Sequence, residues 1–212
     1  VQVYFHSVSR GMEVLLEHLL DRAHELYQED ARNFSLHSQF LIPFLKEDFS
    51  LEDYLKLDDG VLNTYFAQWM DEQDLILSDL AYRFLNRKPL KSITVDSSDN
   101  PLLVEMKDLV EKAGFNPRYY TAINSSYDLP YDLYHPEKGS HRTQIELMQK
   151  DGSLIELSKA SQLVSALTGQ GQGDVRFYYP KEMTQLDSKN SDLFDDYYRA
   201  FTKHIHNGAL VN

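Results

Sequence analysis

The first residues that could do chemistry are Tyr4, His6 and Arg10, which lie just before and within the start of an apolar helical pattern. They offer an aromatic ring that could form one wall of a sugar pocket, a switchable hydrogen-bond donor, and a guanidinium fork that matches phosphate oxygens. A helix that begins beside them would also favour anions. A structural interpretation stays open, in which Tyr4 belongs to the core and Arg10 pairs with Glu13.

A second group of candidates is basic. Arg87, Lys88 and Lys91 lie in the segment 83–91, and Pro89 stands between Lys88 and Lys91. Such a cluster could cradle phosphate groups, because guanidinium and ammonium groups donate charge-assisted hydrogen bonds to phosphate oxygens. The alternative is the end of a helix, where cations suit the negative end of the helix dipole.

A third candidate is Lys181, at the end of the segment Arg-Phe-Tyr-Tyr-Pro-Lys at 176–181. Alternating side chains of a strand share one face, so Phe177 and Tyr179 predict a strand that has one buried face. Lys181 would then either extend into solvent or be carried by the strand end towards an anion.

These three segments resemble those of the HD-domain deoxynucleoside triphosphate (dNTP) triphosphohydrolases, both the bacterial enzymes and the vertebrate SAM- and HD-domain enzyme. The resemblance implies a parent hydrolase that cleaves a dNTP to deoxynucleoside and triphosphate. In the family's Tyr-x-His segment the tyrosine lines the dNTP pocket, which implies the same role for Tyr4. It implies that His6 lies near this pocket or near the neighbouring regulatory site. Arg10 is the third candidate for binding the substrate.

The family's metal site uses a His, a His-Asp pair and a later Asp, all upstream of the Tyr-x-His segment. This chain contains no His-Asp dipeptide. The resemblance therefore implies that the chain is the C-terminal half of such an enzyme. A divalent metal (Mg, Mn, Fe, Zn or Ni) would be bound by the N-terminal half, where it activates water. No catalytic residue and no metal ligand is expected in this chain.

The resemblance also implies regulation. Arg87 and Lys91 match an Arg-x-x-x-Lys element that binds an activating nucleotide, and Lys181 matches a lysine on a late strand of the same family. The implied effector is a nucleotide such as dGTP, bound where subunits of a homo-oligomer meet, and the family analogy gives a homotetramer. A different class of function stays open: a non-catalytic nucleotide-binding or oligomerisation module of the same fold.

The elements that must position these residues are mainly helical up to residue 91. Apolar residues recur at helical spacing through residues 11–28, which predicts a helix with one buried face. Asp58 or Asp59 can cap the next helix, and a third runs through residues 72–86 before Pro89. We expect residues 1–91 to continue an HD domain.

The pattern changes after residue 91, and we expect an α+β lobe at 92–185 and a C-terminal helix within 186–212. Asp151-Gly152 between alternating segments predicts an antiparallel hairpin. The remaining predicted elements are strands at 92–95, 119–124 and 175–179 and helices at 102–112, 158–168 and 192–206. The fold class is therefore α+β, a helical first part followed by a small sheet lobe.

Composition sets limits on the function. The chain of 212 residues is 42% hydrophobic and has no cysteine, which fits a folded protein without disulfides and agrees with a cytoplasmic location. The formal net charge of −12 opposes binding to duplex nucleic acid or to anionic membranes. No apolar run is long enough to span a bilayer. Any phosphate must therefore be bound by a local basic cluster.

Overall fold

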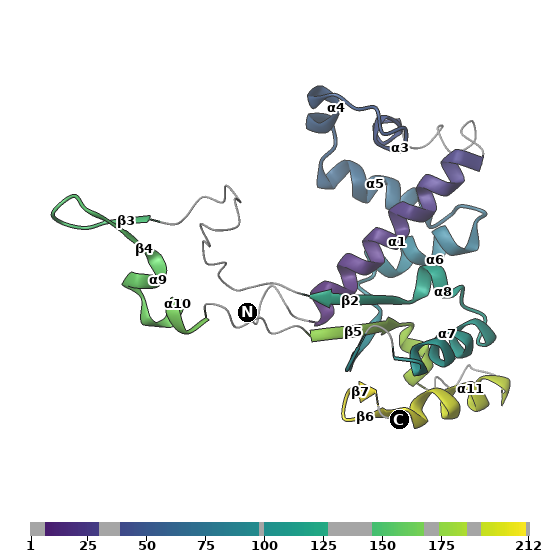
Figure 1. The fold of residues 1–212 in the computed structure, drawn as a ribbon. Coiled ribbons are helices and arrows are strands. Elements are labelled where there is room, and N and C mark those ends of the chain that lie inside the picture. Colours follow the sequence, from purple (N-terminus) through teal and green to yellow (C-terminus); the bar gives the residue numbers. More distant parts are fainter. Residues whose placement is uncertain are drawn as a thin grey trace. The chain divides into compact units, whose positions relative to one another are not determined.

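The computed structural model describes residues 7–29, 39–97, 100–126, 146–167, 174–185 and 192–210. The chain divides into two compact units (Figure 1). The larger unit consists of residues 2–124 and 176–212. The smaller unit, which we call the insertion, consists of residues 125–175 together with residue 1.

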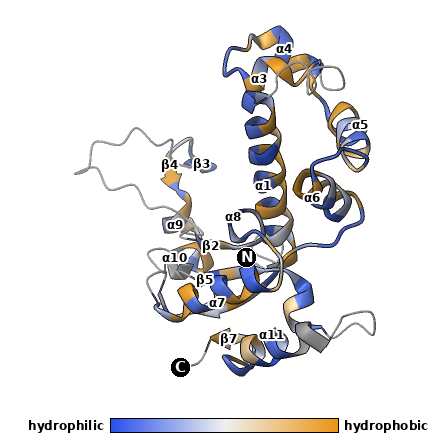
Figure 2. Ribbon diagram, turned by 90° about the vertical axis from the view of Figure 1, so that its right-hand side faces the viewer, coloured by the Kyte–Doolittle hydropathy of each residue, from blue (hydrophilic) through white to orange (hydrophobic). Residues whose placement is uncertain are grey.

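The first part of the larger unit is helical. Its elements are α1 (Ser7–Glu29), α3 (Ile42–Leu45), α4 (Leu51–Lys56), α5 (Asp59–Trp69) and α6 (Leu75–Leu85). Helix α1 carries apolar and polar residues along its whole length (Figure 2), and it packs against α6, which also contacts α5. The buried side chains repeat at helical spacing, as the sequence predicts. They include Leu15, Leu19, Ala23, Phe66, Trp69, Leu77 and Leu80.

Side chains at the N-termini explain where three of these helices begin. The Asp58 carboxylate accepts a hydrogen bond from the Val61 N–H at 2.8 Å, and Asp74 accepts one from the Leu77 N–H at 2.8 Å. Ser50 and Asp53 form a reciprocal capping box at the start of α4. Each cap satisfies a backbone donor that has no partner within the helix.

The second part of the larger unit is built on a five-stranded sheet in the order β2-β5-β1-β7-β6. The strands are β1 (Lys91–Val95), β2 (Ala122–Ser126), β5 (Asp174–Tyr179), β6 (Ile205–His206) and β7 (Ala209–Leu210). The accompanying helices are α7 (Leu102–Lys112), α8 (Pro117–Tyr120), the 3-10 turn η2 (Lys181–Thr184) and α11 (Asp192–Lys203). Phe177, Phe201, Met106 and Met183 are fully buried here. The predicted α+β class is confirmed.

The end of the chain differs from the prediction of a C-terminal helix that reaches residue 206. Helix α11 ends at Lys203, and a short hairpin of β6 and β7 follows. Asn207 and Gly208 form its two-residue turn, and both have positive φ values, of 51° and 77°. An Asn-Gly pair suits a type I′ turn, which requires positive φ at both positions. Strand β7 then pairs in parallel with β1, where Thr94 lies opposite Ala209.

The insertion contains β3 (Glu146–Met148), β4 (Leu154–Glu156), α9 (Leu157–Ala160) and α10 (Gln162–Leu167). Strands β3 and β4 are antiparallel, which confirms the predicted hairpin. Gly152 has a φ of 84° and its N–H donates to the Gln149 carbonyl, so the Asp-Gly pair does form the turn. The two contact units divide the chain near residues 124 and 175, and the predicted boundary at residues 91/92 stays a prediction.

Candidate anion-binding site

A pocket of about 740 Å³ in the larger unit brings together Arg87, Lys91 and Lys181, the three residues predicted to bind a regulatory nucleotide. They come from different elements: Arg87 follows α6, Lys91 begins β1, and Lys181 begins η2. The pocket volume lies within the range of small-molecule sites. Its other polar lining residues are Ser7, Arg83, Lys88, Ser92, Tyr179, Glu182 and Gln185.

Backbone hydrogen bonds at the end of α6 hold Arg87 in an unusual backbone conformation. The Lys88 N–H donates to the Arg83 carbonyl at 2.8 Å, and the Arg87 N–H donates to the Phe84 carbonyl at 3.2 Å. This is the Schellman pattern of hydrogen bonds, whose left-handed position glycine normally occupies. Arg87 occupies it here with a φ of 52°. An arginine in this conformation costs stability that a glycine would not.

Among the residues that the structure describes, Arg87, Lys91 and Lys181 form no ion pair with a carboxylate. Lys88 is engaged differently: its Nζ donates to the Tyr82 hydroxyl at 2.8 Å and lies 4.4 Å from the centroid of that ring. Three cations without acidic partners therefore meet at one cavity of a strongly acidic chain. Their mutual repulsion would be relieved by a bound anion.

Arg83 lies at the same pocket but its charge is already balanced. Its side chain is only 7% exposed, its Nε donates to Asp79 at 2.6 Å, and its two terminal nitrogens bind both oxygens of Glu182 at 3.1 and 2.8 Å. The Tyr120 hydroxyl donates to Asp79 at 2.7 Å. Burial alone would lower the pKa of Arg83, but the hydrogen bond to Glu182 and the charge of Asp79 raise it above its usual value.

Gly11 explains how α1 reaches the rim of the pocket. A β-carbon at this position would lie 2.7 Å from the Leu90 carbonyl oxygen, closer than a side-chain carbon can approach. The absence of a side chain therefore lets α1 lie directly against the backbone that leads into Lys91. Ser7 and Val8, in the first turn of α1, line the same pocket.

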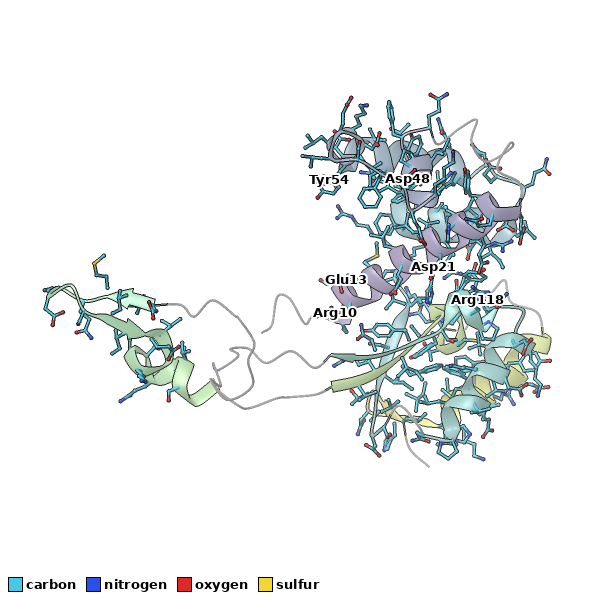
Figure 3. The ribbon with its side chains drawn as sticks, turned by 45° about the horizontal axis from the view of Figure 1, so that its top comes forward. Arg10, Glu13, Asp21, Asp48, Tyr54 and Arg118 are labelled. Atoms are coloured by element: carbon cyan, nitrogen blue, oxygen red, sulfur yellow. The ribbon has the colours of Figure 1, made fainter. Side chains whose placement is uncertain are left out.

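Of the residues predicted to contact the substrate, only Arg10 lies within the described part of the chain, and it does not line this pocket. Tyr4 and His6 lie outside the described residues. Arg10 lies in α1, where its guanidinium forms an ion pair with Glu13 at 2.8 Å (Figure 3). That contact is the one that the structural interpretation of Arg10 predicts, and it leaves the substrate role of Arg10 untested.

Sequence reasoning missed Arg83 and Glu182 at the pocket. In the sequence Arg83 is one of several cations near a helix end, and Glu182 lies 99 positions away. A second network was missed for the same reason: Arg22 of α1 binds both oxygens of Asp74, at 3.1 and 2.6 Å, and also contacts Glu25. The Arg22–Glu25 and Asp79–Arg83 pairs, spaced three and four residues apart, were readable as helix pairs.

Within the described residues, no group of three or more His, Cys, Asp or Glu side chains is arranged to hold a metal ion. None of the described helices combines the length and the apolar character that crossing a membrane requires.

Comparisons with known proteins place the fold. No protein-family model matches the chain. The chain is 38% identical over 183 residues to an uncharacterised protein, YwfO, of Bacillus subtilis, a match that covers 86% of this chain and 42% of that protein. The structure of this chain is similar to that of a phosphohydrolase from Bacteroides thetaiotaomicron, with a TM-score of 0.60 and 23% sequence identity. The match covers 85% of this chain and 46% of that protein.

The chain shares its fold with a phosphohydrolase. It spans less than half the length of either of these proteins. The similarity therefore concerns only the portion of each of these longer proteins that matches this chain.

Proposed function

We propose that this chain is the C-terminal part of a metal-dependent HD-domain phosphohydrolase that cleaves a dNTP to deoxynucleoside and triphosphate. The fold shared with a phosphohydrolase supports the general class. The resemblance of the sequence segments supports the substrate. In this proposal the divalent metal and the residues that hold it belong to a part of the parent outside this chain, and Tyr4, His6 and Arg10 contribute to the substrate pocket.

We further propose that the pocket around Arg87, Lys91 and Lys181 binds the phosphates of an activating nucleotide such as dGTP. The observation that carries this proposal is the convergence of three cations on one cavity of about 740 Å³, with no acidic partner for any of them among the described residues. The surrounding chain has a net charge of −12, so this local excess of positive charge opposes the overall field. Phosphate groups would offset it through charge-assisted hydrogen bonds.

Binding at this pocket would regulate the parent by stabilising its assembled state. A nucleotide that contacts residues of two subunits favours the oligomer in which both sets of contacts exist, by its difference in affinity for the two states. The parent would then be a homo-oligomer, a tetramer by the family analogy, that assembles when the effector is present.

The test uses the full-length parent and two charge reversals. Arg87→Glu should abolish dGTP-induced assembly, measured by sedimentation, and dGTP activation of triphosphate release. Lys46→Glu is the matched control, because Lys46 is exposed and does not line the pocket. The control should assemble and respond like the wild type, and both variants should retain the metal content of the parent.

Each alternative has its own outcome. Normal assembly and activation of Arg87→Glu would show that the basic residues are a helix-end surface cluster and that the regulatory proposal is wrong. A parent that binds nucleotide at the pocket but releases no triphosphate with any of the divalent metals would instead identify a non-catalytic nucleotide-binding module.

A further inference from the structure

The pocket contains one carboxylate, Glu182, among its described lining residues. We propose that Glu182 is an internal counter-anion that lowers the affinity of the pocket for phosphate ligands. This inference rests on the proposed anion site and concerns how tightly that site holds its ligand.

The negative charge of Glu182 is only partly balanced, because Glu182 shares its cationic partner with a second carboxylate. Arg83 supplies one positive charge to two carboxylates, Asp79 at 2.6 Å and Glu182 at 2.8 Å. The group of three therefore carries a net charge of about −1. The Glu182 and Asp79 side chains are 40% and 36% exposed, whereas Arg83 is 7% exposed. Of the two carboxylates, Glu182 is the one that lines the pocket.

The charge of Glu182 should oppose an incoming phosphate. At separations within a pocket, like charges repel appreciably even where water screens them, and the effect grows with the charge of the ligand. Glu182 also engages the terminal nitrogens of Arg83, which could otherwise donate to a phosphate. Both effects weaken the binding of anions.

Glu182 is not the sole anchor of η2. Met183, the next residue, is fully buried, and η2 also packs against α11. Arg83 would keep its hydrogen bond to Asp79 if Glu182 lost its charge. Neutralising Glu182 should therefore leave Lys181 near its place while removing the repulsion.

The experiment measures the affinity of the full chain for inorganic triphosphate by titration calorimetry, at one low salt concentration. Glu182→Gln should bind about three- to tenfold more tightly than the wild type. Its melting temperature should stay the same or fall, because a bidentate charge pair becomes weaker. If Glu182→Gln binds triphosphate more tightly without being more stable, a purely structural role of Glu182 does not explain the result.

The control variant is Asp108→Asn, which removes the same charge from an exposed ion pair with Lys112 that does not line the pocket. It should bind triphosphate like the wild type. Glu182→Ala, which removes the charge without introducing an amide, should tighten binding in the same direction as Glu182→Gln.

The outcomes separate the two proposals. If the wild type binds no triphosphate, the anion site itself is wrong, and the role of Glu182 is wrong with it. If the wild type binds but both Glu182 variants bind equally or more weakly, the anion site stands and Glu182 only supports η2. Equal tightening by Asp108→Asn would mean that net charge, and not the place of Glu182, controls the affinity.

Discussion

Arg87 occupies a backbone position where glycine is the preferred residue, and its side chain lines a pocket. Sparsely populated backbone conformations cluster at functional sites, so the strain at Arg87 gives a reason to test its side chain at this pocket. Glu47 provides a comparison within the same chain. It is exposed, has a φ of 57°, and does not line the pocket.

We predict that Arg87→Gly makes the chain more stable and the pocket weaker. Glycine removes the strain of the left-handed conformation, so the free energy of unfolding should rise by about 0.5 to 1 kcal/mol. Affinity for inorganic triphosphate should fall, because one of the three cations is gone. Glu47→Gly should give a similar gain in stability without that loss of affinity. Thermal melts and calorimetry on the same samples would measure both effects.

If Arg87→Gly lost both stability and affinity, the arginine would be a structural part of the helix end. A gain in stability with unchanged affinity would mean that Arg87 does not contact the anion.

At the scale of elements, the ion pair between Arg22 and Asp74 joins α1 to the start of α6. Asp74 also caps α6, and its side chain is 22% exposed. The hydrogen bond from Arg22 holds the pKa of Asp74 below its usual value, against the opposing effect of burial. A carboxyl whose pKa is lower in the folded protein stabilises the fold above its unfolded pKa, and this stabilisation is lost as the pH falls.

We predict that Asp74→Asn lowers the free energy of unfolding by about 1 to 2 kcal/mol at pH 7, since asparagine keeps the cap but loses the charge pair. The difference from the wild type should shrink as the pH falls below about 4, because there the unfolded chain takes up a proton at this carboxyl before the folded protein does. Urea unfolding at pH 7 and at pH 3.5 would measure it. A difference that stays constant across this range would show that the charge of Asp74 contributes nothing.

The elements that the sequence predicted are those whose signals are local. Helical spacing, the cap at Asp58 and the Asp151-Gly152 turn each involve residues a few positions apart, and the structure has each of them. The pocket was predictable in part, because Arg87, Lys91 and Lys181 were singled out by a family resemblance. Arg83 and Glu182 were not, because their contact depends on how η2 packs against α6. The amphipathic pattern of α11 predicts a helix that continues to residue 206, whereas the Asn207-Gly208 turn holds residues 205–206 in β6.

At the scale of the whole molecule, the proposal assigns binding to this chain and catalysis to the longer parent. We predict that the 212-residue chain alone releases no triphosphate from any dNTP with Mg, Mn, Fe, Zn or Ni, whereas the parent does so with at least one of them. Release of triphosphate from the purified chain, together with a stoichiometric bound metal, would contradict the prediction and would locate a metal site within these residues.

The sheet order has a consequence for how the protein is made. Strand β1 pairs with β7, so Thr94 meets a partner, Ala209, that the ribosome adds more than a hundred residues later. Contacts between such distant segments form slowly, while the α5–α6 contact needs only neighbouring sequence. Ile205 and Gly208 of the late hairpin line the pocket. A nascent chain can therefore fold its helices early, but it cannot complete its pocket until residues 205–210 have left the ribosome.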